Sequence, residues 1–208
     1  METILLIGST MGVSFVAGIR LYATVLLLGL AIRLHVLHLI PAWHSLEVLA
    51  HPAVLGVAAL GCVAEFCADK IPWVDSAWDS IHTVLRPIGA ALIASGMLGA
   101  FDPWARVCLI LLAGGVALAS HGSKAATRLV VNHSPEPFTN IGMSLLGDVF
   151  TPFGLWVAFD HPVLTIVSLA VFLCVMVWMA RRVARLLRRS WSMTSGWLRP
   201  KRTSQGFT

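Results

Sequence analysis

Polar and charged side chains recur at helical spacing between strongly apolar segments of this 208-residue chain. The first group consists of Asp75, Asp79, His82 and Arg86. At ~100° per residue of helix, these four side chains lie within about 60° of one another on one helix face. Asp75 and Asp79 stand one turn apart, as two carboxylate ligands of a divalent cation would. The same group suits a site for a small ion, because His82 adds a side chain that titrates near neutral pH.

Three further polar groups follow the same helical spacing. They are Glu65 with Asp69, then His121 with Lys124, Arg128 and Asn132, and finally Asn140 with Ser144, Asp148 and Thr151. Charge that faces lipid is costly, so polar stripes between membrane segments normally face the bundle interior or water. Two alternatives stay open at this point. In the first alternative, the charges are solvated at the membrane surface. In the second, the carboxylates at 65 and 69 pair with Lys124 and Arg128 only to hold helices together.

The composition indicates an integral membrane protein. Hydrophobic residues make up 57% of the chain and charged residues only 12%, with a mean hydropathy of +0.82. Soluble domains carry about 25% charged residues, so an ordinary soluble enzyme is excluded. Apolar segments lie at about 3–33, 50–68, 87–101, 104–122, 149–159 and 162–180. We therefore expect an all-α fold, a polytopic transmembrane helix bundle of about six spans, with one transmembrane domain over 1–180 and a basic tail over 181–208.

The first apolar segment is too long for one span, since a helix over residues 3–33 would reach ~46 Å against a hydrocarbon core of ~30 Å. It must tilt, protrude or break. The natural place for a break is a polar patch within the segment, formed by Gly18, Arg20, Tyr22 and Thr24.

The net charge of +5 comes from the tail, which holds eight of the fifteen Lys and Arg residues. The rest of the chain is slightly acidic, so we do not expect nucleic acid as a partner. The positive-inside rule places a basic run after an apolar span in the cytoplasm, where it meets anionic lipid headgroups. Six spans then put both termini in the cytoplasm, together with the loops at 69–86 and 124–148.

An internal repeat relates residues 72–92 to residues 137–157 without a gap. The aligned pairs include Pro72 with Pro137, Asp79 with Ser144, Pro87 with Pro152 and Gly89 with Gly154. Prolines at equivalent positions of two repeats are a pointer to discontinuous helices around a transport site. We therefore expect two tandem repeats that contain proline-broken or re-entrant helices.

These motifs resemble a known family, the bacterial membrane proteins catalogued as domain of unknown function 4126. The resemblance rests on AGIRLYATVLLLGLAIRL at 17–34, EFCADKIPWVDSAWDSIHTVLRPIGAALIASG at 65–96 and HGSKAATRLVVNHSPEPFTNIGMSLLGD at 121–148. It implies a multi-pass protein of the bacterial cytoplasmic (inner) membrane. Where we expect an acidic pair near Asp148, this chain has Gly147 instead. The resemblance also implies two polar motifs, composed of Glu65, Asp69, Lys70, Pro72, Asp75, Asp79, His82, Arg86 and Pro87, and of Lys124, Arg128, Asn132, Ser134, Pro135, Glu136, Asn140, Ser144 and Asp148.

Our first functional hypothesis is a transporter or channel for a small ion or small charged metabolite, through a polar cavity lined by both repeats. Arg20, Lys124 and Arg128 would attract an anionic group, whereas the carboxylates at 65, 75, 79 and 148 would bind a cation or carry a proton. The alternatives are a membrane-embedded, metal-dependent enzyme acting on a phosphorylated lipid at Asp75 and Asp79, and a scaffold or assembly protein. We expect the lipid bilayer and a small charged solute as partners, a homo-oligomer, and no cofactor apart from a divalent cation in the enzyme case.

Overall fold

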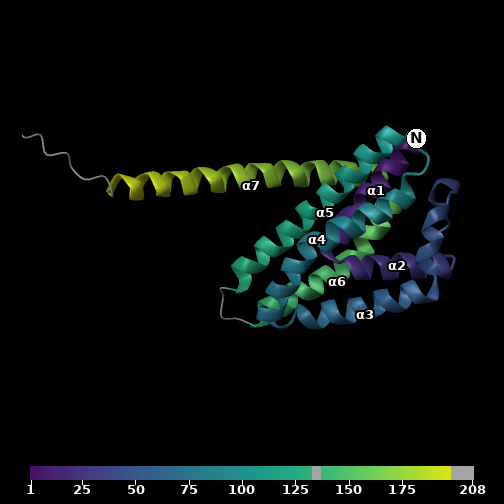
Figure 1. Cartoon of the computed structure of the whole chain (residues 1–208), viewed down its shortest axis with the longest axis horizontal. Coiled ribbons are helices and arrows are strands. Elements are labelled where there is room, and N and C mark those ends of the chain that lie inside the picture. The colour runs from purple at the N-terminus through teal and green to yellow at the C-terminus, as the bar shows by residue number, and fades with distance from the viewer. Residues whose placement is uncertain (133–136, 198–208) are drawn as a thin grey trace, which may run out of the picture. The chain divides into compact units, whose positions relative to one another are not determined.

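The computed structural model describes residues 1–132 and 137–197, and within them it leaves out the side chains of 72, 73, 75, 76, 129–132, 137–141, 187 and 189–197. The described residues form helices and connections without strands (Figure 1). The elements are α1 (Glu2–Ile19), α2 (Leu21–Arg33), the 3-10 helix η1 (Pro41–Ala50), α3 (Pro52–Ala68), α4 (Pro72–Met97), α5 (Pro103–Asn132), α6 (Pro137–Asp160) and α7 (Pro162–Trp197).

The chain divides into two compact units, Met1–Leu169 and the part from Ala170 onward. The first unit holds every helix from α1 to α6 and the beginning of α7, and the second holds the remainder of α7 over its described residues. Every helix from η1 onward begins at a proline. A proline suits the first position of a helix because its missing N–H would have no partner there.

Helix α1 is the central helix of the first unit and is buried over most of its length. It packs against α4, α5 and α6. Two of its buried hydroxyls are satisfied within the helix, since Thr10 Oγ1 donates to the Leu6 carbonyl at 2.6 Å and Ser14 Oγ donates to the Thr10 carbonyl at 2.7 Å. Gly12 lies directly against Ala158 of α6. Small residues at such contacts let two helices approach closely.

The long N-terminal apolar segment breaks at Arg20, as its length and polar patch predict. Arg20 is extended, with φ −145° and ψ 92°, and it separates α1 from α2. Figure 1 shows α2 leaving this point in a direction different from that of α1. Because α1 has 18 residues, it extends over about 27 Å, which is close to the ~30 Å of a hydrocarbon core.

The two prolines inside the aligned segments do not break their helices, so the prediction of proline-broken helices there is wrong, whereas the re-entrant alternative stays a prediction. Helix α4 continues through Pro87 and helix α6 continues through Pro152. Packed membrane helices tolerate an internal proline because neighbouring groups satisfy the freed carbonyl. The discontinuities lie instead at Arg20 and between η1 and α3, which meet at an angle of 68°.

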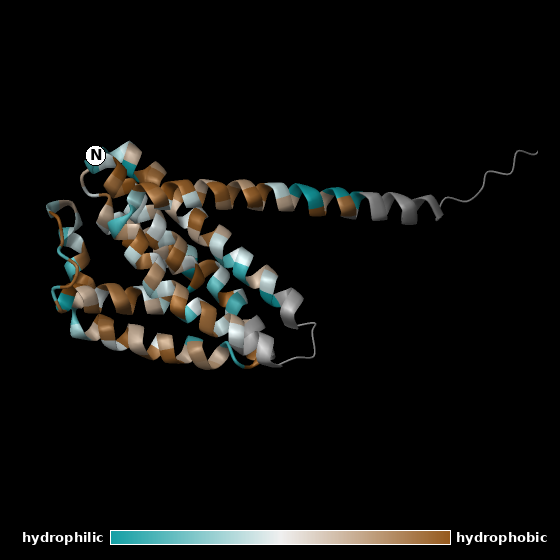
Figure 2. Ribbon diagram, turned by 180° about the vertical axis from the view of Figure 1, so that it is seen from behind, coloured by the Kyte–Doolittle hydropathy of each residue, from teal (hydrophilic) through white to brown (hydrophobic). Residues whose placement is uncertain are grey.

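Within the described residues, four helices are long and apolar enough to cross a membrane, and η1 with α3 would make a fifth span if the bent pair counts as one. Apolar residues predominate along these helices (Figure 2). They indicate a membrane protein, although with fewer spans by this measure than the six expected. The tandem repeat stays a prediction. Its aligned glycines both pack against the first broken segment, Gly89 against Leu21 of α2 and Gly154 against Val16 of α1.

The N-terminus lies at the end of the bundle opposite to Arg20. Gly8 in the first half of α1 lies against Pro162, at the start of α7, whereas Gly18 lies against Ala117 and Ser120 of α5. The count of six spans, which takes residues 3–33 as one crossing, placed the N-terminus on the same side as the loop at 69–86. The structure separates them because α1 alone runs the length of the bundle and ends at Arg20, which contacts Asp69.

Candidate functional site

A buried ion-pair network lies at the break between α1 and α2. We define it as Arg20, Glu65, Asp69, Asp79, Arg86, Lys124, Arg128 and Asp148. These eight side chains come from the break itself and from α3, the α3–α4 connection, α4, α5 and α6. The network thus joins residues that lie up to 128 positions apart in the chain.

Asp69 is the centre of one half of the network. Asp69 Oδ2 forms ion pairs with Arg20 Nη2 at 2.7 Å and with Arg128 Nη2 at 3.1 Å, and all three side chains are buried. Ser144 Oγ of α6 donates to the same oxygen at 3.4 Å. The other oxygen, Oδ1, lies 3.8 Å from Lys124 Nζ.

Glu65 is the centre of the other half. Arg86 Nη2 donates to Glu65 Oε1 at 2.5 Å, and both side chains are inaccessible to solvent. Arg86 Nη1 also lies 3.7 Å from Asp79 Oδ1. Lys124 Nζ lies 4.0 Å from Glu65 Oε1, so this ammonium group stands between the two buried carboxylates without a hydrogen-bond distance to either.

The network reaches solvent at Asp148. Arg20 Nε lies 3.1 Å from Asp148 Oδ1, and the Asp148 side chain is 32% exposed. Arg20 Nη2 further donates to the carbonyl and the hydroxyl of Ser144, at 3.0 and 3.1 Å. Arg20 therefore bridges the exposed carboxylate on α6 and the fully buried Asp69.

The helix break supplies backbone acceptors to the same place. The Gly18 carbonyl accepts from Arg86 Nη1 at 3.3 Å, and the Ile19 carbonyl accepts from Lys124 Nζ at 3.2 Å. The last carbonyls of a helix have no partner within the helix and carry the negative end of its dipole. Cations of α4 and α5 therefore cap the C-terminus of α1.

Two histidines line the network. Arg86 Nη1 donates to His121 Nδ1 at 2.5 Å, so we assign the neutral ring with its proton on Nε2, which points to the Asp79 carbonyl at 3.1 Å. His82 stacks on Trp78 with ring centroids 4.6 Å apart and meets Tyr22 of α2 edge-on at 5.6 Å. The His82 Nδ1 lies 2.8 Å from the Trp78 carbonyl.

The formal charges of the network cancel, since four cations face four carboxylates. Burial by itself raises the pKa of Asp69, which lies just beyond α3, but the nearby Lys124, Arg128 and Arg20 outweigh it and leave this pKa below its ordinary value. Asp69 is therefore ionised at neutral pH. Replacing a buried ion pair by apolar side chains is often neutral or stabilising, so stability alone is a weak reason for such a network.

Four buried carboxylate oxygens of the network have no hydrogen-bond donor among the described residues: Glu65 Oε2, Asp69 Oδ1, Asp79 Oδ1 and Asp148 Oδ2. Most buried polar atoms in native proteins have a partner, and the exceptions require an explanation. Unfilled carboxylate acceptors are suited to a small cation or to a group that donates hydrogen bonds. This is the chemistry that the arrangement offers.

The structure brings together ten of the side chains that sequence analysis singled out: Arg20, Glu65, Asp69, Asp79, His82, Arg86, Lys124, Arg128, Ser144 and Asp148. Lys70 lies outside the network, because it is exposed and its ammonium stands 2.8 Å above the Phe66 ring centroid. The predictions for the side chains of Asp75, Asn132, Glu136 and Asn140 fall outside the described residues.

The predicted divalent-metal pair is not tested as a pair, because only the Asp79 half is described. Over the described part of the chain, no cluster of three His, Cys, Asp or Glu side chains is arranged to hold a metal ion. Asp79 faces Arg86, whose positive charge opposes the binding of a second cation at that oxygen.

Sequence analysis missed three contributors to the site. His121 stands in one of the polar stripes but was not selected as a site residue, and the Gly18 and Ile19 carbonyls carry no side-chain signal at all. The polar patch around Arg20 was the available hint, because a helix that breaks there must expose carbonyls to some donor.

The sequence matches the family model described as "Domain of unknown function (DUF4126)" over residues 7–182. The chain belongs to this family. The match covers all eight residues of the network, so the DUF4126 domain contains the entire candidate site. No curated protein and no solved structure matches the chain.

Proposed function

We propose that this DUF4126 protein is a membrane transporter or channel for a small charged solute, and that the solute is a small cation or a proton. The observation that supports this most is the convergence of eight charges, most of them buried, at a helix break. Discontinuous helices whose ends meet charged side chains are a recurrent way to build an ion or substrate site within a membrane. Ionisable residues that face the interior of a membrane bundle commonly mark such sites.

The depth of the network supports passage across a bilayer. Arg86 lies about 16 Å along α4 from its end at Met97, and Asp148 lies about 18 Å along α6 from its end at Asp160, at ~1.5 Å per residue. Both distances are close to half of the ~30 Å hydrocarbon core. The network thus extends from one end of the bundle to about its middle.

The preference for a cation rests on two carboxylate oxygens without donors, Glu65 Oε2 and Asp69 Oδ1, and on the position of Lys124. The Lys124 ammonium balances Asp69 and Glu65 at 3.8 and 4.0 Å but leaves their hydrogen bonds unfilled. Unlike an arginine, a lysine has a flexible stem and a compact charge that can move. A cation that enters past Asp148 would take the place of Lys124 beside these carboxylates.

We further propose that the end of the bundle with the network faces the cytoplasm of a bacterial cell, because Lys70, Lys124 and Arg128 lie there and basic residues are enriched on that side. In this orientation the N-terminus lies on the opposite side of the inner membrane. The basic residues of α7 would contact anionic lipid headgroups. The homo-oligomer remains a proposal.

Flux into proteoliposomes tests this function. The purified chain is reconstituted with a pH-sensitive dye inside, and gradients of H⁺, Na⁺, K⁺ and NH₄⁺ are imposed in turn, with Cl⁻ and phosphate as anion arms. We expect flux of at least one cation or of protons above that of empty liposomes. Lys124→Met should change this flux at least tenfold, whereas Lys70→Met, which removes an exposed lysine outside the network, should leave it unchanged.

Two outcomes would reject the proposal. Flux no greater than in empty liposomes for every ion contradicts transport of this class, and flux of anions alone contradicts the cation preference. Lys124→Arg keeps the positive charge and serves as a folding control, with monodisperse elution required of every variant. The metal-dependent enzyme and the scaffold protein remain alternatives, and the enzyme would require a metal at Asp75 and Asp79.

A further inference from the structure

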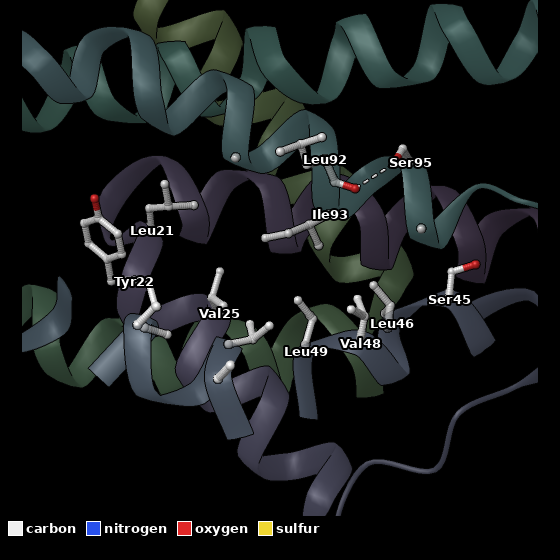
Figure 3. A pocket seen from close by; sticks show the side chains of 16 residues that line it. Leu21, Tyr22, Val25, Ser45, Leu46, Val48, Leu49, Leu92, Ile93 and Ser95 are labelled. Carbon is white, nitrogen blue, oxygen red and sulfur yellow. Dashed lines mark hydrogen bonds between the residues drawn. The ribbon is translucent and has the colours of Figure 1, made fainter. Parts of the chain in front are cut away.

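An apolar groove of about 630 Å³ lies between α2, η1, α3 and α4 (Figure 3). Its walls include Val25 of α2, Leu49 of η1, Val54 of α3 and Ile93 of α4. Ligand pockets of drug-sized molecules fall in the range of ~300–1,000 Å³. The groove therefore has room for an extended chain of many carbon atoms.

None of the residues that line this groove is charged, and nearly all are apolar. Its rim contains exposed aliphatic side chains, with Val57 67% and Leu92 68% exposed. The bent pair of η1 and α3 is a candidate span by length and composition, and in such a span this rim would face hydrocarbon. A charged solute or a polar peptide would lose its hydration here without gaining a partner.

The two ends of the groove differ from its walls. Figure 3 shows Tyr22 and Ser45 at opposite ends of the row of labelled side chains. At the Tyr22 end, the phenol ring contacts His82 beside the ion-pair network. At the Ser45 end, Arg106 Nη2 donates to the Ser95 carbonyl at 2.5 Å, and Ser95 lines the groove. A cation thus stands at the end that is farther from the network.

We propose that this groove binds one acyl chain of an anionic phospholipid, with the phosphate at Arg106 and the chain extending toward Tyr22. An arginine guanidinium matches a phosphate because it presents several N–H donors in a planar fork. The apolar walls stabilise the chain through the burial of its CH₂ groups.

Two glycines of α4 keep the groove open. Gly89 and Gly96 lie two helical turns apart and both line it. A Cβ at Gly89 would meet Leu21, and a Cβ at Gly96 would come within 3.1 Å of Leu46 Cδ2. A larger side chain at either position would therefore narrow the groove.

Native mass spectrometry of the full chain, purified in a mild detergent, tests the proposal with phosphatidylglycerol and phosphatidylcholine as probes. We expect one phosphatidylglycerol retained per chain. Ala53→Trp, which fills the groove from α3, should lower its retention at least tenfold. Leu60→Trp is the matched control, because Leu60 lies on the same helix, is 74% exposed and does not line the groove.

Arg106→Gln should leave a lipid bound but reduce the preference for phosphatidylglycerol over phosphatidylcholine at least fivefold. Equal retention by Ala53→Trp and Leu60→Trp would overturn the assignment to this groove, and an unchanged preference in Arg106→Gln would overturn the role of the phosphate. Val57→Trp gives a second groove variant if Ala53→Trp does not fold. Lipid retention does not depend on ion flux, so the failure of either proposal is distinguishable from the failure of the other.

Discussion

Arg20 Nη2 and Asp69 Oδ2 lie 2.7 Å apart, and neither side chain has more than 1% of its surface exposed. Arg20 is the single extended residue that separates α1 from α2, and Asp69 follows the last residue of α3. This pair therefore ties the break in one membrane segment to the end of another. Every other member of the ion-pair network is connected to it directly or through Lys124.

Removing one partner of this pair should destabilise the protein strongly. Asp69→Asn leaves the Arg20 and Arg128 guanidinium groups buried beside a neutral side chain, and breaking a buried pair in this way costs about 3–5 kcal/mol. We expect the double variant Arg20→Met with Asp69→Asn to lower the free energy of unfolding by less than the sum of the two single variants. Unfolding in detergent, followed by circular dichroism, measures all three. The exposed pair of His44 and Glu47, 3.0 Å apart, is the control, and His44→Ala should change stability by less than about 1 kcal/mol.

Stability should fall at acid pH because of Asp69. The pKa of this carboxyl is lowered in the folded protein, so its contribution is complete above the unfolded value of about 3.9 and is lost as the pH falls through the folded pKa. Thermal unfolding of wild type and Asp69→Asn between neutral pH and pH 3 measures the effect. Their difference in stability should shrink only below about pH 4. A constant difference down to pH 3 would contradict the assignment.

The approach of α1 to α5 should depend on the absence of a side chain at Gly18. An added Cβ would collide with Ala117 and Ser120, so Gly18→Ala should cost about 1–3 kcal/mol through overpacking. Gly122 on α5 has no heavy atom within 4 Å of an added Cβ, and Gly122→Ala should stabilise the helix by up to about 1 kcal/mol. Unfolding of the two variants in detergent gives the comparison. Equal stabilities would show that the close contact at Gly18 is absent.

The two ends of the bundle can be located by labelling single cysteines in inverted and right-side-out membrane vesicles. Glu2 and Lys70 are both exposed, and they lie at opposite ends of the first unit. After replacement of Cys62, Cys67, Cys108 and Cys174 by serine, a membrane-impermeant maleimide should label Glu2→Cys and Lys70→Cys from opposite sides. Labelling of both from one side would instead support the count of six spans, in which residues 3–33 make one crossing and both sites lie in the cytoplasm.

Hydropathy and helical spacing are local properties, and they were sufficient to predict the all-helical membrane fold and the break near Arg20. They also grouped Glu65 with Asp69 and Lys124 with Arg128, because residues four apart share one face of a helix. A break was predictable at Arg20 because no bilayer accommodates the full length of residues 3–33 as one span.

Tertiary packing decided which of those faces meet. Helices α4 and α6 continue through Pro87 and Pro152, and whether a membrane helix tolerates an internal proline depends on its packed surroundings, which the spacing of residues does not reveal. The pairing of Arg20 with Asp69, the capping of α1 by Arg86 and Lys124, and the groove behind Tyr22 depend likewise on how the helices cross. Sequence spacing specifies the direction of a side chain around its own helix, but electrostatic partners are chosen by distance in space, which only the folded bundle determines.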